Sequence, residues 1–576
     1  MTETIISLPG ISRREWLTAA TFSLLICLLL LVPYLLAYTS AGDELVFSDV
    51  LMNPEDSQTY FAKMETGYRG DWLYTVPFTT EPHDPFFVGF LYMALGHMAR
   101  WFGLSLPAVW HAARFLSGAV MFLAIFGFTG LFFHRPRGRW TAFLMATLGS
   151  GLGWLLFLVG EPYWLDAFPI DFKMAEARPF FSALTFPHIA LTTALMLASF
   201  TLTLKALHNA EGRWRNATAA GVVNLLIGIA HPLLVYVIVV AGSLYWLALA
   251  LRARCILWGE GFALAVTFLL LVPLVLYYAY TLATNEVFAG WDAQREGTLS
   301  PPWPHFVVAY GPYLLLAGLF ALRRHFSENG QGSAASGRED AETSDESVAA
   351  RRWLFLWMWV LAVGLLVYAP LNSQRRFVQG VHVALSMLAT AGLLHVILPW
   401  LRRTRPFRWL ADRPRYSPKG MVRLLIVLFL GFMALSNLYV LASVAVSAVV
   451  QQPDPIFRPA AEAEAAAWLR EHGDMSDVVM GSYQTGNYLA ARAGVRVVAG
   501  HWAETIAFAE KEADIQAFYD EATAEETRRQ LLGRYGVDLV WWGPRERELG
   551  AFRPDETAYL QPIYERDEIA IFRVSD

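Results

Sequence analysis

Long apolar blocks recur along the chain, and they constrain its fold more than any other feature of the sequence. Residues 21–37 are almost wholly apolar, and residues 424–450 contain no charged residue. About 20 apolar residues suffice for a helix to cross a bilayer, and a helix satisfies its own backbone polar groups, as lipid requires. Hydrophobic residues make up 55% of the 576 residues and charged residues only 16%, against about 25% charged in a soluble domain. We therefore predict an α-helical polytopic membrane protein.

The basic residues indicate how these blocks are oriented, because short loops rich in Lys and Arg stay cytoplasmic. Arg13 and Arg14 predict a cytoplasmic N-terminus, and the long block after them favours a retained span over a signal peptide. Residues 39–85 contain nine acidic residues against two basic ones and are predicted to lie outside. We interpret residues 86–102 as a helix near the outer surface or a shallow re-entrant helix, because a full crossing would place the basic segment 134–139 outside.

About eleven spans satisfy this rule. We place them at 16–38, 108–133, 140–160, 184–206, 217–231, 233–251, 256–281, 305–322, 353–370, 378–400 and 420–450. The segment 323–352 contains a Ser-, Gly-, Glu- and Ala-rich stretch and is predicted to be a disordered cytoplasmic linker. Arg375 and Arg376 are the exception, because they lie at the outer end between two spans.

The tail differs in pattern from the rest of the chain. We predict an amphipathic helix at 460–472, short strands at 478–480, 495–498 and 539–542, and a helical segment at 513–535. Alternating helices and strands indicate a small α/β domain. The predicted organisation is a transmembrane domain over 1–452, in which 39–107 form the first extracytoplasmic loop with juxtamembrane helices, and an extracytoplasmic α/β domain over 453–576.

The first outside loop contains most of the candidate chemistry. Asp56, Tyr60 and Lys63 follow one another at a spacing that places them on roughly one face of a helix. A carboxylate at the mouth of a membrane cavity can act as a general base or hold a divalent metal. Glu81 and His83 add a further acid and an imidazole beside prolines. A solvated acidic loop would show a similar charge run.

Other candidates lie near the predicted outer ends of the spans. Arg375 and Arg376 either bind a phosphate or form a structural ion pair. His231 precedes a proline, and it either contacts a phosphate, ligates a metal, or caps a helix end. Arg178 and His188 are the better candidates in the second outside segment, which is otherwise explained as a solvated loop.

Two segments of the tail follow predicted strands, where α/β folds place ligand contacts. They are Ser482-Tyr-Gln-Thr-Gly-Asn487 and Gly500-His-Trp-Ala-Glu-Thr505. Turn formation explains their glycines equally well, so ligand binding and a purely structural role both stay open.

Together, these motifs resemble the GT-C superfamily of membrane glycosyltransferases, which includes oligosaccharyltransferase catalytic subunits, protein O-mannosyltransferases and aminoarabinose transferases. The resemblance is carried by Asp56 with Tyr60 four residues later, by Gly70-Asp71-Trp72, and by Glu81-Pro-His-Asp-Pro85 before the apolar segment 86–102. It covers about residues 15–140. The sequence departs from many members in having Glu55 before Asp56 and in separating the two prolines.

The resemblance implies transfer of a sugar from a polyprenyl-phosphate-linked donor to an acceptor on the extracytoplasmic face. By this analogy Asp56 is the base or orients the acceptor, with Glu55 and Asp49 as alternatives. A positive group must stabilise the leaving phosphate, which suits Arg375 and Arg376. The remaining substrate-binding candidates are Tyr60, Lys63, Glu81, His83, Arg178, His188 and His231.

No cofactor is certain, but a divalent metal is an open alternative, with Glu81, His83 and His231 as its candidate ligands. The expected partners are the lipid-linked donor, the bilayer, and an acceptor that is a protein, a glycan or a lipid. We expect no nucleic-acid partner and a multi-pass location in the cell membrane.

Two other classes of function are weighed against the enzyme. A transporter of lipid-linked substrates often shows inverted repeats and broken helices at the membrane midplane, but the sequence shows no repeat and its charges gather at the outer edge. A non-catalytic scaffold leaves the acid, Tyr and His series of the first loop unexplained.

Overall fold

The computed structural model describes residues 10–293, 299–331, 341–413 and 417–575. The chain divides into two compact units. Unit 1 contains Met1–Leu30, Arg114–Val275 and Thr298–Ala442, and unit 2 contains Leu31–Ala113, Leu276–Gly297 and Ser443–Asp576. The predicted boundary at residues 452 and 453 is therefore not where the chain divides, because the first outside loop groups with the tail. Strand pairing explains this: β1 (Leu45–Phe47) is antiparallel to β2 (Phe457–Pro459).

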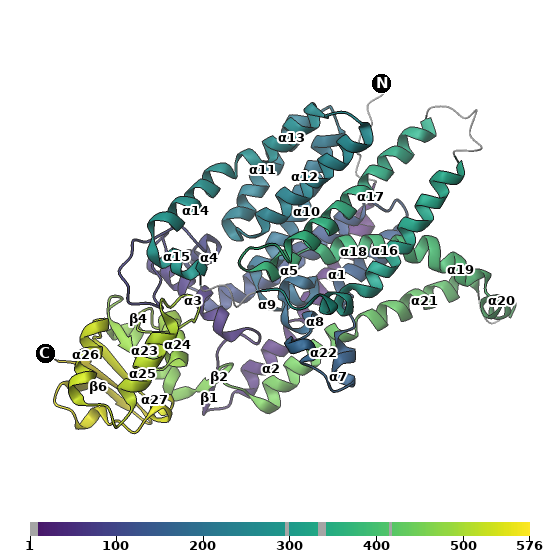
Figure 1. Ribbon diagram of the computed structural model, residues 1–576. Helices are drawn as coiled ribbons and strands as arrows, with labels where there is room; N and C mark the ends of the chain where they lie inside the picture. Colours follow the sequence, from purple (N-terminus) through teal and green to yellow (C-terminus); the bar gives the residue numbers. More distant parts are fainter. Residues whose placement is uncertain (1–9, 294–298, 332–340, 414–416, 576) are drawn as a thin grey trace. The chain divides into compact units, whose positions relative to one another are not determined.

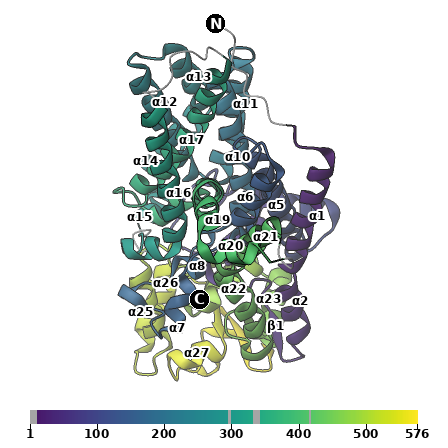
Figure 2. The same cartoon turned by 90° about the vertical axis from the view of Figure 1, so that its right-hand side faces the viewer.

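Unit 1 is built from helices. They are α1 (Arg13–Leu29), most of α5 (Leu106–Thr129), α6 (Pro136–Leu148), α7 (Gly153–Leu158), α8 (Ile170–Lys173), α9 (Pro179–Thr185), α10 (Pro187–His208), α11 (Arg213–Ala230), α12 (Leu234–Ala253), α13 (Trp258–Leu269), α16 (Trp303–Gln331), α17 (Ala341–Leu366), α18 (Val381–Gly392), α19 (Leu398–Arg403), α20 (Arg405–Ala411), α21 (Pro418–Met433) and part of α22 (Leu435–Val446). Helices α10 to α13 lie side by side (Figure 1 and Figure 2).

Buried polar contacts join these helices. Ser199 of α10 donates a hydrogen bond of 2.5 Å to Asn224 of α11, whose side chain in turn donates to the carbonyl of Thr267 in α13 at 2.8 Å. Hydrogen bonds between helices commonly hold membrane bundles together, because lipid supplies no partner. The bundle therefore uses both close packing and polar contacts.

The number of spans is only partly settled. Among the described residues, Arg13–Ser40, Leu106–Thr129, Pro187–His208, Leu234–Ala253, Trp303–His325 and Gln374–Arg403 are helical, long and apolar enough to cross a membrane. Two bent pairs, Trp258–Leu269 with Val272–Thr284 and Pro418–Met433 with Leu435–Gln451, raise the number to eight if each pair is one span. The predicted span 140–160 falls on α6 and α7 with a break between them, and the spans 217–231 and 353–370 fall on α11 and α17. The count of about eleven therefore stays a prediction.

The predicted linker 323–352 is helical at both ends. Helix α16 continues to Gln331 and α17 begins at Ala341. Ala and Glu residues favour helix at the start of α17, and the disordered cytoplasmic linker stays a prediction. Residues 332–340 lie outside the described part of the chain.

The tail in unit 2 contains a five-stranded sheet in the order β4-β3-β5-β7-β6. Strands β4 (Arg496–Val497), β3 (Val478–Met480) and β5 (Leu539–Trp542) are parallel, whereas β7 (Ile569–Val574) and β6 (Leu560–Arg566) complete it antiparallel. The helices beside it are α23 (Ala460–His472), α24 (Tyr483–Arg492), α25 (Phe508–Tyr519), α26 (Glu525–Tyr535) and α27 (Pro544–Leu549) (Figure 1). The helical segment predicted at 513–535 is thus two helices.

The first outside loop folds around two crossed helices, α3 (Pro54–Arg69) and α4 (Phe90–Phe102). A Cβ added at Gly67 would lie 2.0 Å from the carbonyl oxygen of Met93, and one at Gly96 would lie 1.9 Å from that of Met64. Only glycine permits the two backbones to approach so closely. Within the predicted segment 86–102, the helix begins at residue 90. The location of this helix at the membrane surface stays a prediction.

The rest of unit 2 includes α2 (Val32–Ser40), most of α14 (Val272–Thr284) and α15 (Glu286–Ala293). The core of the tail consists of apolar side chains from the strands and from α25 and α26, including Met480, Phe518 and Phe572. This core fixes the loops that follow β3 and β4, and those loops reach the first outside loop.

Candidate functional site

Asp56 lies in the first turn of α3 and is held by a histidine from the tail. Pro54 occupies the start of this helix, where it has no amide proton to leave unsatisfied. Nε2 of His501 lies 3.0 Å from Oδ1 of Asp56. The imidazole is buried, whereas 36% of the carboxylate side chain stays exposed. Nδ1 of His501 is buried and has no hydrogen-bond partner among the described residues, which favours an Nε2–H that donates to Asp56.

The two alternative carboxylates are held by other partners. Asp49 accepts hydrogen bonds of 2.7 Å from Tyr38 and from Arg492, so it forms part of an ion pair. Glu55 is hydrogen-bonded to the hydroxyl of Tyr483, and burial together with this contact raises the pKa of Tyr483. Of these three carboxylates, Asp56 is the one that pairs with an imidazole, and 36% of its side chain is exposed.

Tyr60 and Lys63 follow Asp56 on α3, but the structure gives Lys63 a structural role. Nζ of Lys63 lies 2.8 Å from Oε1 of Glu504 and 4.4 Å from the centre of the Tyr74 ring. Both charged side chains are 4% exposed. The prediction that Lys63 contacts substrate is therefore not favoured. Tyr60 is half-buried and stacks on Tyr92 with ring centres 4.4 Å apart.

Glu81 and His83 are also engaged within unit 2. Glu81 accepts hydrogen bonds from Thr79 and, at 2.7 Å, from Lys511. Burial opposes its ionisation, but the contacts with Lys511 and Thr79 outweigh burial and hold the pKa of Glu81 below its usual value. Burial lowers the pKa of Lys511 more than Glu81 raises it.

His83 has both ring nitrogens in backbone contacts, which argues against a metal. The amide of Val76 donates to Nε2 at 2.9 Å, and Nδ1 lies 2.8 Å from the carbonyl oxygen of Glu81. Burial lowers the pKa of His83, consistent with a neutral ring. In the described part of the chain, no group of three or more His, Cys, Asp or Glu is arranged to hold a metal ion.

Unit 1 brings three of its predicted residues together. The 3-10 helix η4 (Gln374–Val378) carries both arginines, and Arg376 lies 3.9 Å from Glu176. His188 interacts electrostatically with Arg376 and with His231, and the two imidazole centres lie 5.3 Å apart. Arg375 is half-buried and forms no ion pair within the described ranges. This cluster of cationic and imidazole groups suits an anion.

Arg178 lies in a different, fully buried network of unit 1. Nη2 and Nε of its guanidinium donate to Oδ1 of Asp171 at 2.8 and 3.0 Å, and Nη1 lies 2.5 Å from Nδ1 of His382. Asp171 also accepts from the amides of Gly151 and Gly153. These contacts account for Arg178 as a structural residue, so the prediction of substrate binding is not favoured for it.

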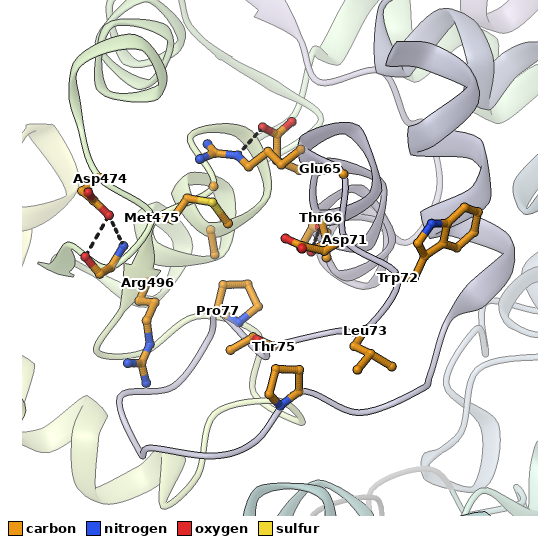
Figure 3. A pocket seen from close by; sticks show the side chains of 17 residues that line it. Glu65, Thr66, Asp71, Trp72, Leu73, Thr75, Pro77, Asp474, Met475 and Arg496 are labelled. Atoms are coloured by element: carbon orange, nitrogen blue, oxygen red, sulfur yellow. Dashed lines mark hydrogen bonds and ion pairs between the residues drawn. The ribbon is translucent and has the colours of Figure 1, made fainter. Parts of the chain in front are cut away.

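A cavity of about 690 Å³ in unit 2 is lined in part by Ala62, Glu65 and Arg69 of α3. Figure 3 shows Asp71 and Trp72 on one side of it and Asp474 and Arg496 on the other. Arg496 donates to the carbonyls of Thr79 and Glu81. The side chain of Asp71 is exposed and has no partner in the described ranges. Mixed charges beside an aromatic ring suit a polar ligand.

Sequence reasoning missed the partners that the tail supplies. His501 and Glu504 both lie in the segment Gly500–Thr505, which was singled out as a loop after a strand. They contact Asp56 and Lys63 across more than 400 positions. The segment was singled out because it follows a predicted strand. No local pattern in the sequence indicates which distant loop the segment contacts.

Comparisons with known proteins rest on structure. No protein-family model matches the sequence, and no curated protein matches it. The Archaeoglobus fulgidus oligosaccharyltransferase in the apo form is similar over 92% of this chain and 70% of that chain, with a TM-score of 0.54 and 13% identity. The same enzyme tethered to an acceptor peptide containing the NVT sequon gives 0.51 and 15% identity over 92% and 69%.

ArnT from Cupriavidus metallidurans, in the apo state, covers 95% of this chain and 97% of that chain with 14% identity. Its TM-score is 0.48. At the identities found for the oligosaccharyltransferase, similarity establishes a shared fold.

Proposed function

We propose that this chain, which has the GT-C glycosyltransferase fold, transfers a sugar from a polyprenyl-phosphate-linked donor to an acceptor on the extracytoplasmic face. One observation carries the proposal. The carboxylate of Asp56 is partly exposed at the start of α3, and the buried imidazole of His501 fixes its orientation. In this fold, a fixed and accessible carboxylate suits general-base catalysis.

In the proposed reaction, Asp56 accepts the proton of the acceptor's nucleophilic group. A bond forms between that nucleophile and C1 of the sugar while the bond from C1 to the phosphate oxygen breaks. The electron pair of the broken bond passes to the phosphate. Arg375 and Arg376 stabilise this charge, because fixed cations act strongly on charge that develops in a site from which water is largely excluded. Asp56 belongs to unit 2 and the arginines to unit 1, so their meeting at one cavity is part of the proposal.

Contacts within unit 1 support the proposed sidedness. Arg139 pairs at 2.6 Å with Glu15 near the N-terminus, and Arg352 donates to the carbonyl of Leu131 at 2.9 Å. These contacts join segments that the positive-inside rule assigns to the cytoplasm. The contact of Arg376 with Glu176 joins two segments assigned to the outside.

The test is glycosyl transfer from radiolabelled polyprenyl-phosphate sugars in membranes that contain the full chain. We expect Asp56→Asn to lower the rate by about 10²–10⁴-fold, since it removes a general base. We expect Arg375→Ala to lower it by about 10²–10³-fold. Asp84→Asn is the matched control, because Asp84 is an exposed acid of the same loop.

Transfer at the wild-type rate by Asp56→Asn would remove Asp56 as the base. If folded wild-type protein transferred no sugar from any lipid-phosphate donor, a non-catalytic membrane binding protein would replace the enzyme hypothesis.

A further inference from the structure

A second cavity lies in unit 1, at the end assigned to the cytoplasm. Its volume is about 530 Å³, it is open to the surface, and it is lined by the turn between α5 and α6, the π-helical turn η5 (Leu393–Ile397) and the start of α19. Apolar side chains, among them Phe133, Leu394 and Leu398, form part of its lining. The other side chains are basic: His134, Arg135, Arg137, His395 and Arg402. Among the residues that the structure describes, no carboxylate lines the cavity.

The backbone around the cavity is irregular at the helix junction. The π-helical turn η5 lies between α18 and α19 and carries His395 on the surface. Single π-helical turns inside helices are frequently found at functional sites. Pro136 occupies the first turn of α6 on the opposite side, after Arg135. The sequence thus places cationic side chains on both sides of one cavity.

The arginines of this cavity have no acidic partner among the residues that the structure describes. Within the described ranges, the side chains of Arg135, Arg137 and Arg402 form no ion pair, although the neighbouring Arg139 is paired with Glu15. Burial and repulsion from Arg402 and Arg423 lower the pKa of Arg137. Like charges held close together repel each other, so an anion placed between them would be stabilised.

The surroundings point to the membrane interface. The turn follows the predicted span 108–133, and η5 (Leu393–Ile397) lies within the last residues of the predicted span 378–400. Trp400 and Trp409 are 61% and 59% exposed on α19 and α20, and exposed Trp is typical of the interface between lipid and water. A ligand there meets guanidinium groups on one side and apolar side chains on the other.

We propose that this cavity binds the phosphodiester headgroup of an anionic phospholipid of the cytoplasmic leaflet. Basic pockets between membrane helices on that side bind anionic headgroups. Arg137 and Arg402 contact the phosphate, and the apolar lining contacts the glycerol and the first part of the acyl chains. The site does not depend on the glycosyl-transfer reaction.

The experiment is lipid retention by the full chain, measured by native mass spectrometry and by titration in nanodiscs with phosphatidylglycerol or phosphatidylcholine. The double variant Arg137→Gln with Arg402→Gln is compared with Arg403→Gln and Arg408→Gln. The control removes the same charge from exposed arginines of α19 and α20 that do not line the cavity. We expect the first pair to weaken phosphatidylglycerol binding by roughly thirtyfold and the second pair to leave it nearly unchanged.

Three results would overturn the inference. The first is equal retention of phosphatidylglycerol and phosphatidylcholine by the wild-type protein, a result that requires no variant. The second is an equal loss of phosphatidylglycerol binding in both double variants. The third is saturation of the site by inorganic phosphate with no additional binding of phosphatidylglycerol. The inference is supported if the wild-type protein retains phosphatidylglycerol in preference to phosphatidylcholine and only the Arg137→Gln, Arg402→Gln variant loses this preference.

Discussion

The buried pair between Lys63 and Glu504 makes a quantitative prediction. Nζ of Lys63 lies 2.8 Å from Glu504, whose other oxygen accepts a hydrogen bond of 3.0 Å from Tyr74. Glu504→Gln removes the buried carboxylate that pairs with Lys63. Breaking a buried ion pair by removal of one partner costs about 3–5 kcal/mol. Because Glu504 lies three residues after His501, the same change loosens the loop that orients Asp56.

The free energy converts into a measurable shift of the melting temperature. A change of 1 kcal/mol shifts Tm by about 2–4 °C in a cooperative unit of about 150–250 residues, so we expect Glu504→Gln to lower Tm by roughly 6–20 °C. The assay is thermal unfolding of the purified full chain in detergent, followed by tryptophan fluorescence. Lys63→Met with Glu504→Gln removes both charges and should recover most of the loss.

An exposed pair supplies the control. Arg566 and Glu464 form an ion pair in which both side chains are largely exposed, so Glu464→Gln should change stability by less than about 1 kcal/mol. Unchanged melting of Glu504→Gln would refute the reasoning, as would a double variant that melts no higher than the single one. If Lys63→Met altered only the KM for donor and left Tm unchanged, Lys63 would be a substrate contact after all.

Three further predictions follow from unit 2. Lys511 and Thr79 lower the pKa of Glu81 in the folded state against the effect of burial. The stabilisation by ionised Glu81 is therefore present above about pH 4.5 and is lost as pH falls through the folded pKa. The difference in Tm between wild type and Glu81→Gln should shrink as the pH falls through this window, and a constant difference would contradict the prediction. Gly96→Ala should destabilise the protein by about 1–3 kcal/mol in denaturant titration, because its Cβ meets backbone, whereas Gly533→Ala, with open space around it, should not. Asp71→Asn should raise the KM for acceptor if the cavity of Figure 3 binds it, with kcat and the KM for donor unchanged; an effect on donor alone would contradict this.

Local patterns predicted the tail well. The helix at 460–472 and the strands at 478–480 and 539–542 have the predicted bounds, because the helix is amphipathic and each strand is a short apolar run. The predicted helix at 513–535 is interrupted after Tyr519, since Arg528 of α26 reaches back to the carbonyl of Phe518 and stabilises the break. Such a contact depends on tertiary structure and leaves no local signal.

The sequence did not predict which residues from distant segments contact the candidate site. Asp56 was singled out from its loop, and the structure supplies His501 as its partner. Lys63 was assigned to substrate because its spacing places it on one helix face with Asp56, and Arg178 because it lies in the second outside segment. The structure instead gives each a buried carboxylate partner, Glu504 for Lys63 and Asp171 for Arg178. Both outcomes require contacts between distant segments, which composition and spacing do not encode.

The most direct test of the account is an experimental structure of the full chain bound to a polyprenyl phosphate. The account predicts that the phosphate lies within hydrogen-bond distance of Arg375 or Arg376, in a cavity that also exposes the carboxylate of Asp56. A phosphate held by other cations, or one that shares no cavity with Asp56, would contradict the central claim.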